Sequence, residues 1–426
     1  SAGSGFVDFD MLSWTSNSGL PPAPLTIVLR TIASQLGLAL GELQEEARGL
    51  RKLAKTYLET KPERPLEVTA GRPPLGVGPA LAQVEALAAP GCGTTRVAWS
   101  AGEERLLARI QAKERLDPPD NKVVLSAFMA LKAIVTNTED TKVAVLDRGA
   151  VPLLLVSLRY FAHCDMLHVP RFESAGIAAL VLDTLWALIW TPKDQAAQSP
   201  TAHAVAAQCV ASGLMIRLVE GVRCHQAEPM VAAAGQQLLG AVLAALVGGP
   251  GGGGGHHKPS KMAEGFSVGF ASSVADSPHA WHIRHCLAGT KDGLLFLVEH
   301  FGQFQSLAPL VWLAATNLAL MLTGSTERDA SFIQTDLLGL KLSGPLVASL
   351  IEHVYEPLVA EALLKLMHAL VTKGKFGAML KNDLKKARAA EAIFKIATVH
   401  GDASPGGVMH WVKAAREALN KKVNDD

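Results

Sequence analysis

The chain has 426 residues, of which 49% are apolar and only 5% aromatic, with a formal net charge of +1. This length is too great for one small core and favours two or three domains or one elongated repeat array. Few aromatics with abundant Ala and Leu favour closely packed helices over a β-sandwich. The near-zero net charge gives no whole-chain basis for binding nucleic acid, so we do not expect a nucleic-acid partner.

The N-terminal residues, SAGSGFVDFDMLSW, lack the basic and apolar regions of a secretory signal peptide. They also lack an initiator Met, which fits a processed chain, a fragment or a removed transit peptide. The cysteines include no CxxC pair and indicate reduced thiols, mostly in the core: Cys92, Cys164, Cys209, Cys224 and Cys286. We expect a cytoplasmic protein, with an organellar matrix left open.

In chain order, residues 1–24 predict an extended arm, and 25–102 predict a helical extension with Pro- and Gly-rich linkers. Residues 103–247 predict a series of consecutive helices that form the first half of a repeat array. Residues 248–281 form a Gly-rich insert, expected to be flexible because polyglycine orders only at high entropic cost. The second half, 282–426, ends in cap helices.

Two segments, Met230–Gly249 and Leu307–Leu322, are apolar enough to raise the question of a membrane. The first has Gln236 and Gln237 at its centre, and the second is short for a span that needs about 20 residues. Neither is flanked by a cluster of Lys or Arg. We expect both segments to be buried helices and no membrane partner.

A glycine-led apolar helix recurs along the chain, each time followed by a longer Ala- and Leu-rich helix. The leading glycines are Gly149, Gly213, Gly293 and Gly344. The glycine-led helices are expected at Arg148–Leu158, Ser212–Val222, Asp292–Phe301 and Ser343–Val354, and the longer ones at Ser174–Trp190, Pro229–Val247, Leu307–Leu322 and Pro357–Val371. Stacking against neighbours on both sides would bury faces that one unit alone cannot, which is the logic of a solenoid.

The segment ALKAIVTNTEDTKVAVLDRGAVPLLLVSL (Ala130–Leu158) resembles an armadillo repeat in the order of its third helix, turn, first helix and Leu-rich second helix. Asn317–Gly339 resembles the same order more loosely. The resemblance spans roughly residues 103 to 399 and about five units. It implies an all-α, right-handed solenoid, here with long inserts.

Local chemistry at the clearest unit supports the same reading. Gly149 can end a helix in the left-handed conformation, and Pro152 falls in the first turn of the next helix. Asp140 and Thr141 are predicted to cap the start of the preceding helix.

One enzymatic alternative is GFSVG (Gly265–Gly269), which matches the G-x-S-x-G elbow of serine hydrolases with Ser267 as nucleophile. The elbow needs a buried strand before it, whereas a glycine run precedes it here. Possible metal ligands lie at spacings unlike common zinc sites: His279, His282, His285 and Cys286, and separately His163, Cys164 and His168. We expect no catalytic, cofactor or metal site and no small-molecule substrate.

The resemblance also implies a groove lined by third helices, where Asn holds a peptide backbone and Trp forms shelves. Trp186 and Trp190 lie one turn apart on an expected third helix, and Trp190 stands where the family often has its Asn. Asn317 lies in TNLAL, which resembles the family's SNLA. Ala133 occupies the corresponding position of the clearest unit, so the ladder is irregular. Core packing is the alternative for Trp186 and Trp312.

The C-terminal segment Lys373–Ala397 is basic and amphipathic, and suits an acidic partner or a nucleic acid backbone or, as the favoured alternative, a solvated helix face. The candidate partner-binding residues are Trp186, Trp190, Asn317, His368, Lys373, Lys375, Lys381 and Lys385. Together these features predict a non-catalytic scaffold that binds other protein subunits in a large assembly. The resemblance to armadillo proteins implies a cilium or cytoskeleton, with the ciliary axoneme, or an organellar complex as the first candidate settings. The alternative is a soluble adaptor that binds a linear peptide in the groove.

Overall fold

The computed structural model of the chain describes residues 22–59, 101–136, 139–162, 171–190, 200–225, 227–247, 287, 293–323, 327–401 and 407–421. Of these residues 86% are helical and none forms a strand, which confirms the all-α class. The expected Gly-rich insert lies outside the described residues, as does the expected arm before Pro22.

The N-terminal helices are α1 (Pro22–Gln35), α2 (Leu40–Glu59), α4 (Ala101–Leu116) and α5 (Asn121–Val135). They are followed by α6 (Glu139–Asp147), α7 (Ala150–Ala162), α8 (Arg171–Ile189), α10 (Pro200–Ala211), α11 (Leu214–Cys224) and α12 (Pro229–Val247). The remaining helices are α14 (Leu295–Gln303), α15 (Ala308–Thr323), α16 (Glu327–Gly339), α17 (Ser343–Glu352), α18 (Pro357–Thr372), α19 (Gly377–Lys386), α20 (Ala389–His400) and α21 (Val408–Asn420).

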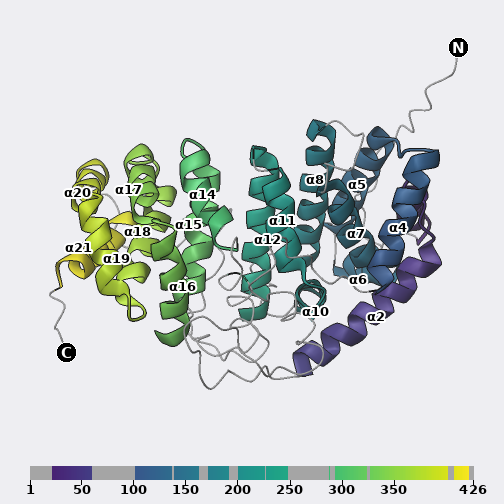
Figure 1. The fold of residues 1–426 in the computed structure, drawn as a ribbon, viewed down its shortest axis with the longest axis horizontal. Coiled ribbons are helices and arrows are strands. Elements are labelled where there is room, and N and C mark those ends of the chain that lie inside the picture. The colour runs from purple at the N-terminus through teal and green to yellow at the C-terminus, as the bar shows by residue number, and fades with distance from the viewer. Residues whose placement is uncertain are drawn as a thin grey trace, which may run out of the picture.

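The helices stack in two rows along an elongated molecule (Figure 1). One row, which we call the third-helix row, contains the third helix of each unit. Each member packs against the next in the order α1, α5, α8, α12, α15, α18 and α21. The other row, which we call the second-helix row, contains the second helices. Its members also pack each against the next, in the order α7, α11, α14, α17 and α20. The order first, second, third helix therefore repeats in α6–α8, α10–α12, α16–α18 and α19–α21. The predicted pairs of second and third helices are present as α7–α8, α11–α12, α14–α15 and α17–α18, whereas the unit α19–α21 was not predicted.

The two strongly apolar segments are core helices. They form α12 and α15, which pack against α8, against each other and against α18. Among the described helices no single one is long and apolar enough to cross a membrane, and α1 and α2 reach that threshold only as a pair bent by 101°.

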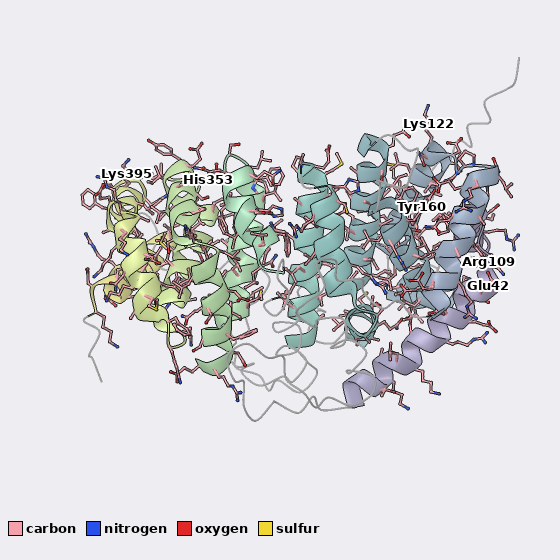
Figure 2. The ribbon with its side chains drawn as sticks, viewed as in Figure 1. Glu42, Arg109, Lys122, Tyr160, His353 and Lys395 are labelled. Atoms are coloured by element: carbon pink, nitrogen blue, oxygen red, sulfur yellow. The ribbon has the colours of Figure 1, made fainter. Side chains whose placement is uncertain are left out.

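Helix α2 crosses the first units diagonally, along the lower edge in Figure 1, and packs against α6, α7 and α10. Arg109 on α4 forms an ion pair with Glu42 on α2 at 2.8 Å (Figure 2). The backbone of α2 comes close to Gly149, where a Cβ would lie 2.6 Å from the carbonyl carbon of Leu43. Gly149 is therefore required both for its left-handed backbone and for the seating of α2.

A left-handed residue precedes most second-row helices. Gly149 (φ 86°) takes this conformation, as expected, and Gly213 (φ 78°) does so too. Before α17 it is Lys341 (φ 53°), and before α20 it is Arg388 (φ 67°). The leading glycine Gly344 is already the second residue of α17 and is not the left-handed residue of that turn.

The end of α16 explains the position of Lys341. Its N–H donates to the Leu338 carbonyl at 3.1 Å, and the N–H of Leu342 donates to the Leu337 carbonyl at 3.3 Å. This is the hydrogen-bond pattern of a Schellman motif, which requires its left-handed residue at position 341.

Three other local predictions need correction. Helix α6 begins at Glu139, so Asp140 and Thr141 lie inside it and are not its caps; the Thr141 hydroxyl instead donates to the Ile134 carbonyl of α5 at 3.1 Å. The basic segment 373–397 is two helices, α19 and α20, because the left-handed Arg388 interrupts it. Residues 159–172 and 191–203 were expected to be irregular inserts, but α7 and α8 extend into the first segment and α10 into the second.

Histidine-to-carbonyl hydrogen bonds join successive second-row helices. In each case the histidine is the twelfth residue after the left-handed residue. Its Nε2 bonds to a carbonyl at the end of the preceding second-row helix. The pairs are His225 with Phe161 (3.0 Å), His353 with Gln305 (2.6 Å) and His400 with Val354 (2.8 Å). The constant spacing shows that these helices stack in one register. Figure 2 labels His353 at the end of α17.

A buried ion pair fixes α4 to the second unit. Arg217 on α11 and Glu103 on α4 are both buried and form two hydrogen bonds. Beside them Arg159 on α7 pairs with Glu104 at 3.0 Å, and burial lowers the pKa of Arg159. A buried charge without its partner costs several kcal/mol, so this pair ties α4, α7 and α11 into one arrangement.

We expect Gly149→Ala to lower the free energy of unfolding by about 3 kcal/mol, because the variant combines a left-handed alanine with a clash against Leu43. Lys341→Gly should leave stability within about 1 kcal/mol or raise it, because glycine relieves the left-handed strain. Urea denaturation followed by circular dichroism measures both. Equal effects of the two substitutions would contradict the assigned turn geometry.

Candidate functional site

In the third-helix row, α8 and α18 each leave one stripe of side chains uncovered. On α8 the exposed or partly exposed residues recur every three or four positions: Glu173, Gly176, Leu180, Asp183, Trp186 and Trp190. The same spacing recurs on α18 at Leu358, Glu361, Lys365 and His368. We call the surface formed by these stripes the third-helix face.

Contacts between neighbouring helices show that these stripes are continuous. Lys132 on α5 pairs with Asp183 on α8 at 2.8 Å, and the amide of Asn121 on α5 donates to Glu173 on α8 at 3.0 Å. The third-helix face is therefore one connected surface at this end of the stack, with charged groups tied across it.

The end of α8 presents the first aromatic cluster. Trp186 and Trp190 are stacked, with ring centroids 5.4 Å apart and planes 27° apart. Trp186 is half-buried against the core, whereas Trp190 is 44% exposed. The ammonium of Lys142 on α6 donates to the Trp190 carbonyl at 2.6 Å, which satisfies an otherwise open acceptor at the helix end. The pair is thus held at its backbone and stacked at its rings.

A second aromatic cluster lies between α18 and α21. The Trp411 ring meets the His368 ring edge-on at 5.6 Å, and the Lys365 ammonium lies 5.4 Å from the Trp411 centroid. Burial lowers the pKa of His368, and the nearby positive charges of Lys373 and His410 lower it further. Sequence reasoning proposed His368 but missed Trp411 and Lys365, which come together only through the packing of α18 on α21.

Asn317 lies in a buried polar junction among α12, α14 and α15. Its Nδ2 donates to the Gln236 carbonyl at 2.9 Å, and the Gln236 side chain amide contacts Nδ1 of His300. A Cβ at position 240 would lie 2.9 Å from the Asn317 Oδ1, so Gly240 makes room for it. The Asn317 amide joins the two halves of the array and is not accessible to a ligand in this arrangement.

The proposed basic residues are divided between surface and interior. Lys373, Lys375 and Lys385 are exposed, whereas Lys381 is buried and its ammonium donates to the Lys421 carbonyl at the end of α21. Lys381 therefore anchors α21 and adds nothing to an exposed basic surface.

Helix α16 fixes the turn that carries Lys373 and Lys375. The Gln334 amide donates to the Leu370 carbonyl at 2.9 Å, and its oxygen accepts from the Phe376 N–H at 3.1 Å. Gly374 (φ 70°) lies so close to Gln334 that a Cβ would be 2.4 Å from its oxygen. The two exposed lysines therefore stand on a turn with a defined backbone.

The enzymatic alternatives fall on parts of the chain outside the described residues. These include Ser267 with its GFSVG motif and the His and Cys groups at 163–168 and 279–286. Within the described ranges, no group of three or more His, Cys, Asp or Glu is placed to hold a metal ion. Of the cysteines, Cys209 is a core residue, and burial raises the pKa of its thiol to about 12, whereas Cys224 is exposed.

No protein-family model and no curated protein sequence matches this chain. Among solved structures, a designed armadillo repeat protein, YIII(Dq)4CqI, is similar with a TM-score of 0.40 and 15% sequence identity. The match covers 73% of this chain and 99% of the designed protein.

The buried junction predicts a pH dependence of stability. Burial lowers the pKa of His300 to about 4, from an ordinary value of 6.5. His300 therefore takes up a proton near pH 6.5 in the unfolded chain but only near pH 4 in the folded chain. The free energy of unfolding consequently decreases as the pH falls through that range. We expect the stability advantage of wild type over His300→Gln to shrink by on the order of 3 kcal/mol between about pH 7 and pH 4.

The difference between the two proteins is the quantity to measure, because Asp336 acts in the opposite direction. Burial raises its pKa to about 6, so this carboxyl adds stability as the pH falls. Met379→Ala, at an exposed residue without a titratable group, is the control and should run parallel to wild type. A constant difference between wild type and His300→Gln would contradict the assigned burial.

Proposed function

We propose that this protein is a non-catalytic scaffold, a right-handed solenoid of armadillo-like units that holds other protein subunits in a larger assembly. The stacked Trp186–Trp190 pair carries the proposal. Its backbone and rings are already fixed, so little conformational freedom is lost when a partner covers it. Trp is also the residue type most enriched among those that dominate binding energy at protein interfaces.

The surroundings of the pair support a protein partner. The face is extended, carries salt-bridged charges beside exposed rings, and repeats an aromatic cluster at Trp411. An interface with aromatic anchors inside a polar rim is typical of protein–protein contacts. The strongly buried polar groups, among them Arg217 and His300, contact other helices and serve packing between units.

A soluble adaptor that grips one linear peptide would use the same face, but through Asn317 as well as Trp186. The Asn317 amide already bonds to α12, which favours a scaffold whose contacts are side-chain anchors over a peptide-backbone ladder. A ciliary axoneme and an organellar complex are the settings in which we propose to look for the assembly first.

We expect the tagged full chain, expressed in its native cells and purified at low salt, to co-migrate with other protein chains. Trp186→Ala/Trp190→Ala should reduce the recovery of at least one of them about tenfold or more, because truncating an interface Trp commonly costs above 1 kcal/mol. Quantitative mass spectrometry of the co-migrating chains gives the readout.

Ile351→Ala is the matched control, because Ile351 is exposed to the same 44% as Trp190 but lies on α17 in the second-helix row. It should leave the partners unchanged. The proposal fails if wild type runs as a free monomer, or if the double variant keeps every partner at the control level.

A further inference from the structure

The last second-row helix exposes positions that the earlier ones bury. Counted from the left-handed residue, the second, sixth and ninth residues form one helical stripe. In α7 and α17 all are buried: Val151, Leu155 and Leu158, and Ser343, Val347 and Leu350. In α20 the same positions are Ala390, Phe394 and Ala397, and none of them is buried. We call these three residues the terminal stripe.

Packing between units explains the contrast. Helix α11 follows and contacts α7, and α20 follows and contacts α17. Among the described helices, α20 contacts α17, α19 and α21, and no further second-row helix follows it. Phe394 is consequently 60% exposed at the position where Leu155 and Val347 are covered. The terminal stripe thus has the geometry of a helix-packing site with an aromatic residue at its centre.

The charge of the last unit indicates what would cover the stripe. Helices α19, α20 and α21, with the turn at Arg388, carry seven Lys or Arg against three Asp or Glu. Two of those acids are already paired, Asp383 with Lys386 and Glu391 with Arg388. Lys385, Lys395, Lys413 and Arg416 remain exposed around the end of the stack, where Figure 2 labels Lys395. The whole chain is nearly neutral, so this excess is local.

We propose that the terminal stripe binds an acidic amphipathic helix of another protein, which packs on α20 where the second helix of a further unit would lie. Its apolar side covers Phe394, and its carboxylates face the surrounding cations. A second copy of this chain is a poorer occupant, because pairing two such ends would oppose like charges. The inference extends the proposed function to a second surface and does not depend on the Trp186–Trp190 pair.

The test is fluorescence anisotropy with the full chain and a labelled helical peptide of about 16 residues, Leu on one face and Glu on the other. We expect micromolar binding. Phe394→Ala should weaken it about tenfold or more, and replacing every Glu of the peptide by Lys should do the same. Leu116→Ala, at a residue 88% exposed at the end of α4 and outside both proposed surfaces, is the control and should bind like wild type.

Several results would overturn the proposal. One is equal binding of a scrambled peptide with the same composition, and another is unchanged binding by Phe394→Ala. A monomer–dimer equilibrium in sedimentation that Phe394→Ala abolishes would assign the stripe to a second copy. Phe394-dependent binding of a labelled single-stranded oligonucleotide in place of the peptide would assign it to nucleic acid. Loss of partners in the Trp186→Ala/Trp190→Ala variant is measured separately, so the two proposals fail independently.

Discussion

The register between successive second-row helices is the constraint on which the rest of the structure depends. A left-handed residue precedes α7, α11, α17 and α20, and in the last three cases a histidine twelve residues later bonds to a carbonyl at the end of the preceding second-row helix. The last carbonyls of a helix have no partner within it, so each needs one from outside. Here the next unit supplies the donor, and the need for that bond sets how far one unit is shifted against the next. This shift in turn aligns the third helices into one face.

Buried polar groups fix the relative positions of neighbouring helices, which apolar packing alone would leave variable. Ala and Leu helices can slide against one another at small cost, whereas a buried ion pair or amide tolerates few arrangements. Arg217 with Glu103 fixes α4 against α11, and the Gln236, His300 and Asn317 junction fixes the two halves. Gln334 does the same for the turn before α19. These buried polar groups therefore serve the assembly of the stack.

Much of the fold was predictable because its signals are local. The glycine turns at Gly149 and Gly213 and the long Ala- and Leu-rich helices follow from residue type and spacing. Lys341 and Arg388 escaped prediction, since non-glycine residues rarely take the left-handed conformation and only the helix-ending hydrogen bonds reveal it. The crossing of α2 over α7 and α10 depends on contacts between distant segments, for which the sequence holds no pattern.

The candidate site was predictable only in part, for the same reason. Two tryptophans one turn apart indicated a shared helix face, and the structure stacks Trp186 on Trp190. Asn317 and Lys381 were chosen for their chemistry, but burial directs their polar groups to α12 and to the end of α21. Trp411 joins a cluster because α18 packs beside it, and Phe394 is exposed because none of the described second-row helices covers it. Exposure at a given register position is a property of the stack and cannot be read from one helix.

Hydrogen exchange of the full chain, alone and in its natively purified assembly, tests the scaffold account most directly. The account predicts slower exchange on assembly at the C-terminal end of α8 and along α20, with the interior helices α12 and α15 unchanged. Identical exchange in both samples, or a natively purified chain without any partner, would contradict it.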